Sequence, residues 1–148
     1  MREDAAAWMR RRRIRQWALG EVTLEAIVGQ VRRGEWFVVR GDHTVVAAVR
    51  VLTNDDSAWG SRPPDALYVH GLVVHRRYVG RALGRQLLEW VESLAATTGR
   101  SFIRLDCVEG NLALRYYYRA AGYHEVGRHD FDPPWLPATL FEKALASR

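Results

Sequence analysis

The stretch Leu72–Gly84, with the sequence LVVHRRYVGRALG, joins an apolar run to the start of a helical pattern. Small residues stand at alternate positions in it, at Gly80, Ala82 and Gly84. The first N–H groups of a helix have no intrahelical partners and carry the positive end of the helix dipole, so an anion binds there when small side chains let it approach. The stretch therefore predicts a strand, a phosphate-binding turn and a helix, or else a turn whose small residues serve packing alone.

The turn contains neither of the two most familiar nucleotide-binding patterns. A dinucleotide-binding fingerprint requires G-x-G-x-x-G, and a mononucleotide P-loop ends in G-K-S or G-K-T. Residues 75–84 have neither pattern. Arg76, Arg77 and Arg81 surround the small residues and add positive charge. The turn is therefore compatible with a phosphate-bearing ligand that these two patterns do not identify.

Apolar periodicity divides the chain into a regular succession of elements. Helices are predicted over 3–19, 22–33, 80–98 and 111–121, and strands over 36–40, 44–52, 66–74, 101–107, 123–128 and 139–145. Gly71 interrupts the third strand, and a glycine inside a strand often marks a bulge. Residues 54–65 read as a polar loop. The order predicts one α+β domain, residues 1–148, with a mixed sheet.

Composition excludes several classes of protein. The chain has 148 residues, of which 48% are hydrophobic and 26% charged, as in an ordinary soluble domain. No apolar run approaches the roughly 20 residues that cross a bilayer, and the N-terminus lacks the apolar segment of a secretory signal. Cys107 is the sole cysteine, which excludes an internal disulfide and a cysteine-based metal site. We therefore expect a cytoplasmic protein that does not associate with a membrane.

Charge suggests an anionic partner without identifying it. There are 22 Lys and Arg against 17 Asp and Glu, a net charge of +5. The run Arg10–Arg13 could mark a nucleic-acid-binding protein. Four consecutive residues of a helix point all around it, however, so they cannot form one groove-reading face. We therefore keep nucleic acid only as an alternative partner.

Residues in the second half of the chain, taken with the turn, resemble the GNAT N-acetyltransferase superfamily. A later motif of that family, N-x-x-A-x-x-x-Y-x-x-x-G-F, has its counterparts at Asn111, Leu114, Tyr118, Gly122 and Tyr123, with leucine replacing the family's small residue. The resemblance covers residues 66–128 well and the whole chain more loosely. It is strongest to the short single-domain bacterial acetyltransferases whose N-terminal helix carries R-x-x-Q-W, here residues 13–17.

The family's pyrophosphate motif, R/Q-x-x-G-x-G/A, fits the turn in two registers. Arg77, Gly80 and Ala82 match its letters. In the other register Gly80, Ala82 and Gly84 take the small positions, and Val79 stands where Arg or Gln is usual. Spacing to the leucines of the following helix favours this second register. The family's contacts there come mainly from backbone N–H groups, so a valine is tolerated, with no side-chain role expected for it.

The resemblance implies a fold and a reaction. The fold is a three-layer α/β/α arrangement whose mixed, mostly antiparallel sheet is splayed between strands 4 and 5 of the family's count, here 66–74 and 101–107. The reaction moves an acetyl group from acetyl-CoA, the cosubstrate, to a primary amine of a small molecule by direct attack in a ternary complex. It requires no metal, and no cluster of ligands with metal-binding spacing is evident in the sequence. A homodimer, common among relatives, stays open.

The resemblance also assigns the cofactor-binding residues. Backbone groups hold the pyrophosphate at Val79, Gly80, Arg81, Ala82, Leu83 and Gly84, and the acyl-pantetheine arm lies along Leu72, Val73 and Val74. A backbone N–H of that strand would also stabilise the carbonyl oxygen as it gains charge. Asn111 would contact the cofactor, serve as a helix N-cap, or do both. Tyr118 matches the family's general acid, which protonates the departing thiolate.

Catalysis also needs a group that deprotonates the acceptor's ammonium. We assign it to His70, which lies beside the Gly71 bulge and titrates in the right range. The sequence leaves other candidates open, namely Asp106, Glu109, His124, Asp55 and Asp56. Cys107 is expected to be structural, since direct attack needs no nucleophilic cysteine.

The acceptor site is expected between the N-terminal helices, the loop 54–65 and the loop near Trp135. Trp17, Asp55, Trp59 and Trp135 are its predicted lining, and with Asp56 and Asp132 they would suit a cationic amine. Two alternatives to the enzyme remain. One is a catalytically silent acyl-CoA-binding sensor, and the other is a basic nucleic-acid-binding protein that uses the arginine-rich first helix.

Overall fold

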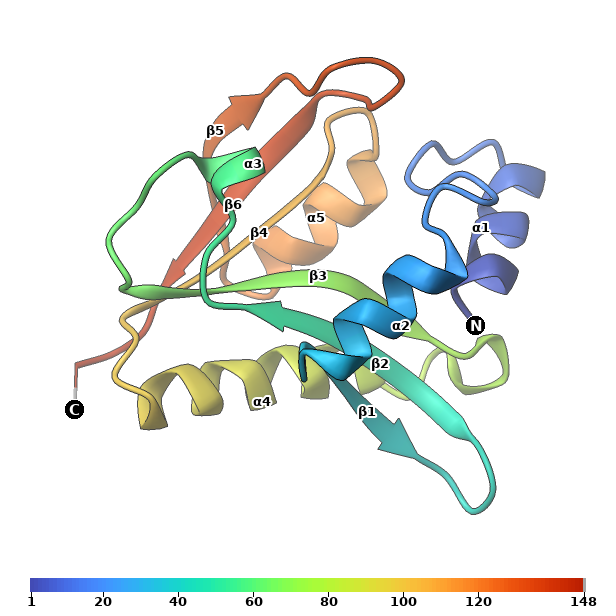
Figure 1. The fold of residues 1–148 in the computed structure, drawn as a ribbon, viewed down its shortest axis with the longest axis horizontal. Coiled ribbons are helices and arrows are strands. Elements are labelled where there is room, and N and C mark those ends of the chain that lie inside the picture. Colours follow the sequence, from blue (N-terminus) through green and yellow to red (C-terminus); the bar gives the residue numbers. More distant parts are fainter. Residues whose placement is uncertain (148) are drawn as a thin grey trace.

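A six-stranded sheet runs through the middle of the molecule in the computed structural model, which describes residues 1–147 (Figure 1). Its strand order is β1-β2-β3-β4-β6-β5. The strands are β1 (Trp36–Arg40), β2 (Val45–Leu52), β3 (Ala66–Val74), β4 (Phe102–Val108), β5 (His124–His129) and β6 (Ala138–Ala144). Only β3 and β4 pair in parallel; the other neighbours are antiparallel. The prediction of a mixed, mostly antiparallel sheet is confirmed.

Helices cover both faces of this sheet. They are α1 (Arg2–Arg11), α2 (Leu24–Arg32), α3 (Asp56–Trp59), α4 (Leu83–Thr97) and α5 (Leu112–Ala120), with a short 3-10 turn η1 (Arg76–Tyr78). Consecutive residues of a strand point to opposite faces. Accordingly, Ala48 of β2 belongs to the cluster that contains Ala5 and Met9 of α1, whereas Val49 belongs to the core on the opposite face, which contains residues of α4 and α5. The predicted three-layer α/β/α architecture is confirmed. No helix within residues 1–147 has the length and apolar character needed to cross a bilayer.

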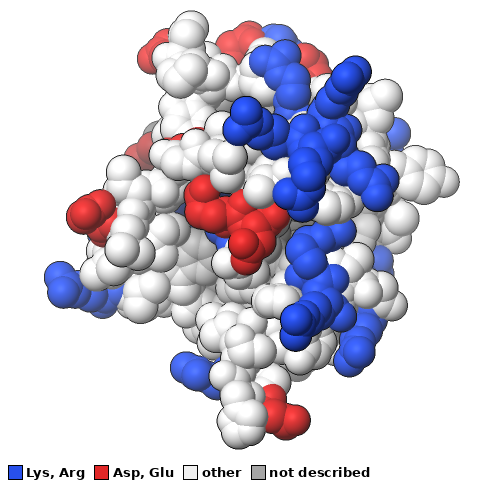
Figure 2. Space-filling model, turned by 90° about the vertical axis from the view of Figure 1, so that its right-hand side faces the viewer, with Lys and Arg blue, Asp and Glu red and all other residues white. Residues whose placement is uncertain are grey.

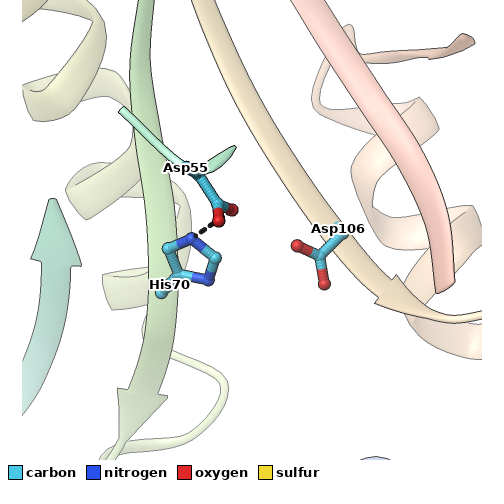
Figure 3. Close-up of side chains that lie close together, drawn as sticks. All are labelled: Asp55, His70 and Asp106. Atoms are coloured by element: carbon cyan, nitrogen blue, oxygen red, sulfur yellow. Dashed lines mark ion pairs between the residues drawn. The ribbon is translucent and has the colours of Figure 1, made fainter. Parts of the chain in front are cut away.

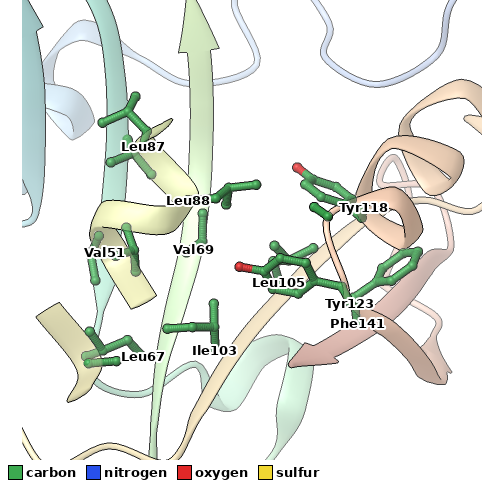
Figure 4. Close-up of a cluster of buried hydrophobic side chains, with 14 of the residues drawn as sticks. Val51, Leu67, Val69, Leu87, Leu88, Ile103, Leu105, Tyr118, Tyr123 and Phe141 are labelled. Carbon is green, nitrogen blue, oxygen red and sulfur yellow. The ribbon is translucent and has the colours of Figure 1, made fainter. Parts of the chain in front are cut away.

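The largest hydrophobic core lies between the sheet and the layer of α4 and α5 (Figure 4). Apolar residues of β2, β3 and β4 meet Leu88 and Val91 of α4, both fully buried. Cys107 is fully buried in the same core. Burial, helped by the charge of Asp106, raises the pKa of its thiol to about 12, so Cys107 carries no thiolate at neutral pH.

The first helix is shorter than the sequence predicts. It ends at Arg11 rather than at residue 19, in a Schellman motif: the Arg13 N–H donates to the Arg10 carbonyl and the Ile14 N–H to the Met9 carbonyl. Arg13 adopts the left-handed conformation, φ 57°, and Ile14 folds back into the cluster that contains Met9. Residues 12–23 therefore form an irregular segment, and the R-x-x-Q-W motif lies in it rather than on a helix.

Three further differences concern local packing. The apolar side chains Leu24, Val28 and Val31 of α2 do not reach a core, because all three are exposed. The loop 54–65 contains the one-turn helix α3, which was not predicted from the sequence because the segment is polar. The helix predicted from residue 80 begins at Leu83, because Gly80 and Ala82 have φ of +87° and +57° and cannot continue a right-handed helix.

Strands β3 and β4 separate in the middle of the sheet. They pair only from Ala66 to Val69 on β3, and beyond that the two ribbons diverge (Figure 1). Next to this point β3 carries a bulge. Ala48 and Arg50 of β2 are two residues apart, but their partners on β3, Val73 and His70, are three residues apart. Gly71 sits in this bulge with φ +59°, as the glycine predicts. A Cβ at residue 71 would lie 2.6 Å from the indole of Trp36, so the close approach also requires glycine.

Replacing Gly71 with alanine tests this bulge. Gly99→Ala is the matched control, because Gly99 also has a positive φ, +72°, but has open space around it. We expect Gly99→Ala to lower the free energy of unfolding by about 1 kcal/mol, from backbone conformation alone. Gly71→Ala adds a contact with Trp36 and should cost about 2–4 kcal/mol in all. Urea denaturation measures both variants, and equal losses would show that Trp36 does not constrain residue 71.

Candidate active site

A cavity of about 1100 Å³ lies on the side of the sheet that carries α1 and α3. Its walls come from the end of α1, the irregular segment after it, α2, α3 and the loop 131–136. Its floor is the place where β3 and β4 diverge, with His70 and Gly71 contributed by β3 and Asp106 and Val108 by β4. The separation of the two strands thus exposes polar side chains inside the sheet.

Three titratable side chains meet on this floor: Asp55, His70 and Asp106 (Figure 3). The Nε2 of His70 lies 2.9 Å from Oδ2 of Asp55, and Asp106 faces the imidazole across the gap between β3 and β4. One donor atom from each of the three lies within 4.8 Å of the others. Within residues 1–147, this is the one group of His, Cys, Asp and Glu whose spacing would also suit a metal ion.

Asp55 is held rigidly by its place at the start of α3. It is the N-cap of that helix, and its Oδ1 accepts hydrogen bonds from Ser57 Oγ at 2.9 Å and from the backbone N–H of Ala58 at 3.4 Å. Burial alone would raise the pKa of Asp55, but the hydrogen bond with His70 and these two contacts bring it below its ordinary value. Asp55 is therefore ionised and fixes the orientation of the imidazole.

His70 and Asp106 are both made more basic by this arrangement. Burial would lower the pKa of His70, but the hydrogen bond to Asp55 and the charge of Asp106 outweigh it, so the pKa is raised. Burial raises the pKa of Asp106, with a smaller opposing effect from His70. Nε2 faces Asp55 Oδ2, so in the neutral ring that carries its hydrogen on Nε2 the other nitrogen, Nδ1, keeps a lone pair. The cluster can accordingly accept a proton from a group bound in the cavity.

The turn before α4 is open and lacks a side-chain cap. Ala82 is the N-cap of α4 and supplies no capping side chain, so the first N–H groups of the helix have no side-chain acceptor. Around Gly80 there is open space, since an added Cβ would meet nothing within 4 Å. At Gly84 an added Cβ would lie 2.9 Å from the hydroxyl of Tyr117, so this glycine also serves the packing of α5 on α4. The side chain of Val79 is exposed.

Tyr118 projects from α5 into the main core. It packs against Tyr123 and Phe141, and Figure 4 shows its hydroxyl end directed toward the space between α5 and β3. Only 6% of its surface is exposed. Burial raises the pKa of the Tyr118 hydroxyl, which therefore stays protonated and is available as a donor.

Asn111 caps α5 and connects it to the N-terminal segment. Its Oδ1 accepts a hydrogen bond from the Leu114 N–H at 3.2 Å, which is the N-cap role foreseen for asparagine. Its Nδ2 donates to Oε1 of Gln16 at 3.1 Å, and the same oxygen accepts from the Val108 N–H at 3.1 Å. Gln16 of the R-x-x-Q-W motif was not among the predicted site residues, because nothing in its local sequence indicates a contact with α5.

The residues predicted to line an acceptor site do not all reach the cavity. Trp17, Asp55 and Trp135 line it. Trp59 does not: it is 6% exposed and packs edge-on against Tyr68, with ring centroids 6.0 Å apart. We therefore leave Trp59 out of the site. Asp55 both lines the cavity and pairs with His70 at 2.9 Å.

Three of the alternative proton acceptors lie outside the cluster. Glu109 pairs with Arg128 at 2.9 Å, and Asp56 and His124 are exposed on α3 and β5. None of these three residues lines the cavity that contains His70 on its floor. Of the other residues that the sequence offered as proton acceptors, the fold places only Asp55 and Asp106 beside His70. No local pattern indicates this meeting, because the three residues come from separate elements.

Comparisons with known proteins point to one family. The model of the acetyltransferase (GNAT) family matches residues 3–123. The chain is 34% identical over 129 residues to the uncharacterized N-acetyltransferase YesJ of Bacillus subtilis (strain 168), an alignment that covers 82% of this chain and 72% of YesJ.

Solved structures agree in fold. A GNAT-family acetyltransferase from Listeria monocytogenes has 25% sequence identity and a TM-score of 0.80, over 97% of this chain and 85% of that one. Ard1 from Thermoplasma volcanium shares the fold at 12% identity, with a TM-score of 0.71 over 99% and 93% of the two chains.

A pH titration of His70 followed by NMR tests the electrostatics of the cluster. We expect the His70 imidazole to titrate above 6.5, the ordinary pKa of histidine, and the midpoint to fall in Asp55→Asn, which keeps the helix cap but loses the charge. His70→Gln assigns the resonance among the five histidines. Because the pKa of His70 is higher in the folded state than in the unfolded state, protonation of His70 stabilises the folded protein at pH values below 6.5. This stabilisation is lost as the pH rises through the pKa of His70 in the folded protein. An unchanged midpoint in Asp55→Asn would contradict the pairing.

Proposed function

This chain belongs to the acetyltransferase (GNAT) family, and we propose that it transfers an acetyl group from acetyl-CoA to the primary amine of a small molecule by direct attack within a ternary complex. The observation that carries the proposal is the meeting of three features at one break in the sheet. The break separates β3 from β4, an uncapped helix N-terminus follows β3, and a proton-accepting cluster lines the floor of the adjacent cavity. The alternatives of a silent sensor and a nucleic-acid-binding protein are not favoured by any of these features.

The turn between β3 and α4 is the proposed site for the pyrophosphate of acetyl-CoA. Backbone N–H groups over Val79–Gly84 would donate to the phosphate oxygens, where the helix dipole also favours negative charge. Open space around Gly80 supports this, as does the absence of a competing side-chain cap at Ala82. Three exposed arginines flank the turn, Arg76, Arg77 and Arg81, and none has an ion-pair partner within residues 1–147.

The edge of β3 beyond the bulge is the proposed site for the acyl-pantetheine arm. Val73 and Val74 pair with β2 on one side, but β4 does not pair with this part of β3 on the other. Backbone groups of Leu72–Val74 on that side can therefore pair with an extended amide-containing chain, as an added strand would. One N–H of this edge would stabilise the carbonyl oxygen as it becomes an oxyanion.

Proton transfers are assigned to two side chains. His70 Nδ1 accepts a proton from the acceptor's ammonium, assisted by Asp55, which orients the ring and stabilises the imidazolium. The neutral amine then attacks the thioester carbonyl to form an N–C bond. The attached nitrogen loses its extra proton to solvent, and the C–S bond breaks. Tyr118 donates a proton to the departing sulfur and regains it from solvent. Asn111, already the cap of α5, is proposed to contact the cofactor beside it.

Acetyl-CoA binding measured by calorimetry tests the phosphate site. We expect binding by the purified protein and a loss of at least about tenfold in affinity for Gly80→Leu, because the added side chain fills the open space where the ligand would lie. Gly80→Ala is the matched control, since it carries the same backbone strain at φ +87° with little added bulk. Equal affinities for the two variants would remove the turn from the proposal.

Release of free thiol in the presence of amines tests the catalytic roles. Tyr118→Phe should lower kcat by about 10- to 100-fold while leaving acetyl-CoA affinity unchanged, as expected for a general acid. Tyr117→Phe is the neighbouring control and should keep its kcat, because the Tyr117 hydroxyl lies against Gly84 rather than at the break in the sheet. A full kcat for Tyr118→Phe would show that sulfur leaves without help from this residue.

A further inference from the structure

The wall of the large cavity is richer in arginine than the sequence suggests. Its charged lining consists of Arg2, Arg10, Arg13, Arg15, Arg50, Glu21, Asp55, Asp106 and His70. Two of these arginines are neutralised: Arg2 pairs with Glu21, and Arg50 pairs with Glu35 at 2.7 Å. The acidic lining expected from Asp56 and Asp132 is absent, since neither residue lines the cavity.

Three arginines of this wall remain without an acidic partner. Arg10, Arg13 and Arg15 are exposed, and none forms an ion pair within residues 1–147. They sit at and just after the end of α1. Figure 2 shows the side of the molecule on which α1 lies in Figure 1, and basic side chains form a band on that side. Arg13 also holds the left-handed position of the Schellman motif, where glycine would be the least strained residue. An arginine there places a guanidinium at the rim of the cavity.

We propose that the acceptor is an amine that also carries an anionic group, a carboxylate or a phosphate, and that Arg10, together with Arg13 and Arg15, binds this group. The inference rests on the proposed function and specifies its acceptor. The amine would lie at the cluster of His70 and Asp106, while the anion would lie at the arginine-lined wall of the same cavity. Guanidinium groups suit both anions, because their paired N–H groups match two oxygens at once.

The phosphates of acetyl-CoA are assigned elsewhere. Neither the turn Val79–Gly84 nor the strand edge Leu72–Val74 contributes a residue to this cavity. Arg13 and Arg15 also line a second cavity of about 400 Å³ beside Asn111, close to the proposed cofactor path. Arg10 lines only the large cavity, so its replacement reports on the acceptor alone.

Acetylation of matched acceptors by Arg10→Gln and Arg11→Gln tests the proposal. Arg11 is the control because it is the exposed neighbour on the same helix and lines neither cavity. The acceptors are α-amino acids paired with their α-amides, and 2-aminoethyl phosphate paired with 2-aminoethanol. Within each pair only one member carries the anionic group. The first pair therefore tests a carboxylate, and the second tests a phosphate. Thiol release gives kcat and KM, and calorimetry gives the affinity for acetyl-CoA.

We expect the native protein to prefer the anionic member of at least one pair. In Arg10→Gln the KM for that acceptor should rise about tenfold with kcat unchanged, because the contact is made equally in the ground and transition states. KM for the neutral partner and the affinity for acetyl-CoA should not change, and Arg11→Gln should behave as the native protein. Added salt should raise the KM of the anionic acceptor only.

Several results would overturn the inference while leaving the proposed function in place. These are a preference for the neutral members, no turnover of any anionic amine although acetyl-CoA binds, and equal effects of Arg10→Gln and Arg11→Gln. A loss of acetyl-CoA affinity in Arg10→Gln would instead assign this arginine to the cofactor and overturn its acceptor role. Failure of acetyl-CoA to bind the native protein would refute the proposed function itself.

Discussion

Trp36 occupies the space that a side chain at residue 71 would need, so the bulge of β3 requires glycine at this position. Because β3 gains an extra residue there, its later half turns away from β4, and the two strands stop pairing after Val69. A continuous sheet would have used every backbone group on both edges of β3. The bulge instead leaves one edge free, opens the floor of the cavity and exposes His70 and Asp106 to a bound molecule.

The same break decides the electrostatics of the site. A histidine on a fully paired central strand would face either the core or solvent, whereas His70 lies between two carboxylates that come from other elements. Burying these groups is unfavourable unless they pair. Asp55 satisfies that requirement because the cap of α3 already fixes its carboxylate, so the imidazole gains an ionised partner in a set geometry. The result is a basic group held at the place where we propose that the acceptor's ammonium loses its proton.

The N-terminal segment completes the cavity. Its course depends on the early end of α1, where Ile14 folds back onto Met9, and on Gln16, which accepts hydrogen bonds from β4 and from the cap of α5. Arg76 of η1 lies 3.8 Å over the ring of Trp8, which ties α1 to the turn before α4. These contacts join the N-terminal segment, which carries Arg10, Arg13 and Arg15, to the turn proposed for phosphate, so the two ends of the proposed site belong to one packed unit.

The sequence by itself determined the order of the strands and of the helices other than α3, the open turn before α4 and the cap of α5, because each depends on residues close together in the chain. Alternating apolar residues define β2, and small residues define the turn at Gly80. Only the tertiary structure decided that Asp55, His70 and Asp106 meet, that Trp59 is buried away from the cavity, and that the wall is basic. Local patterns encode helices, strands and caps, whereas the distance between side chains on separate elements depends on how the strands pair and where they part.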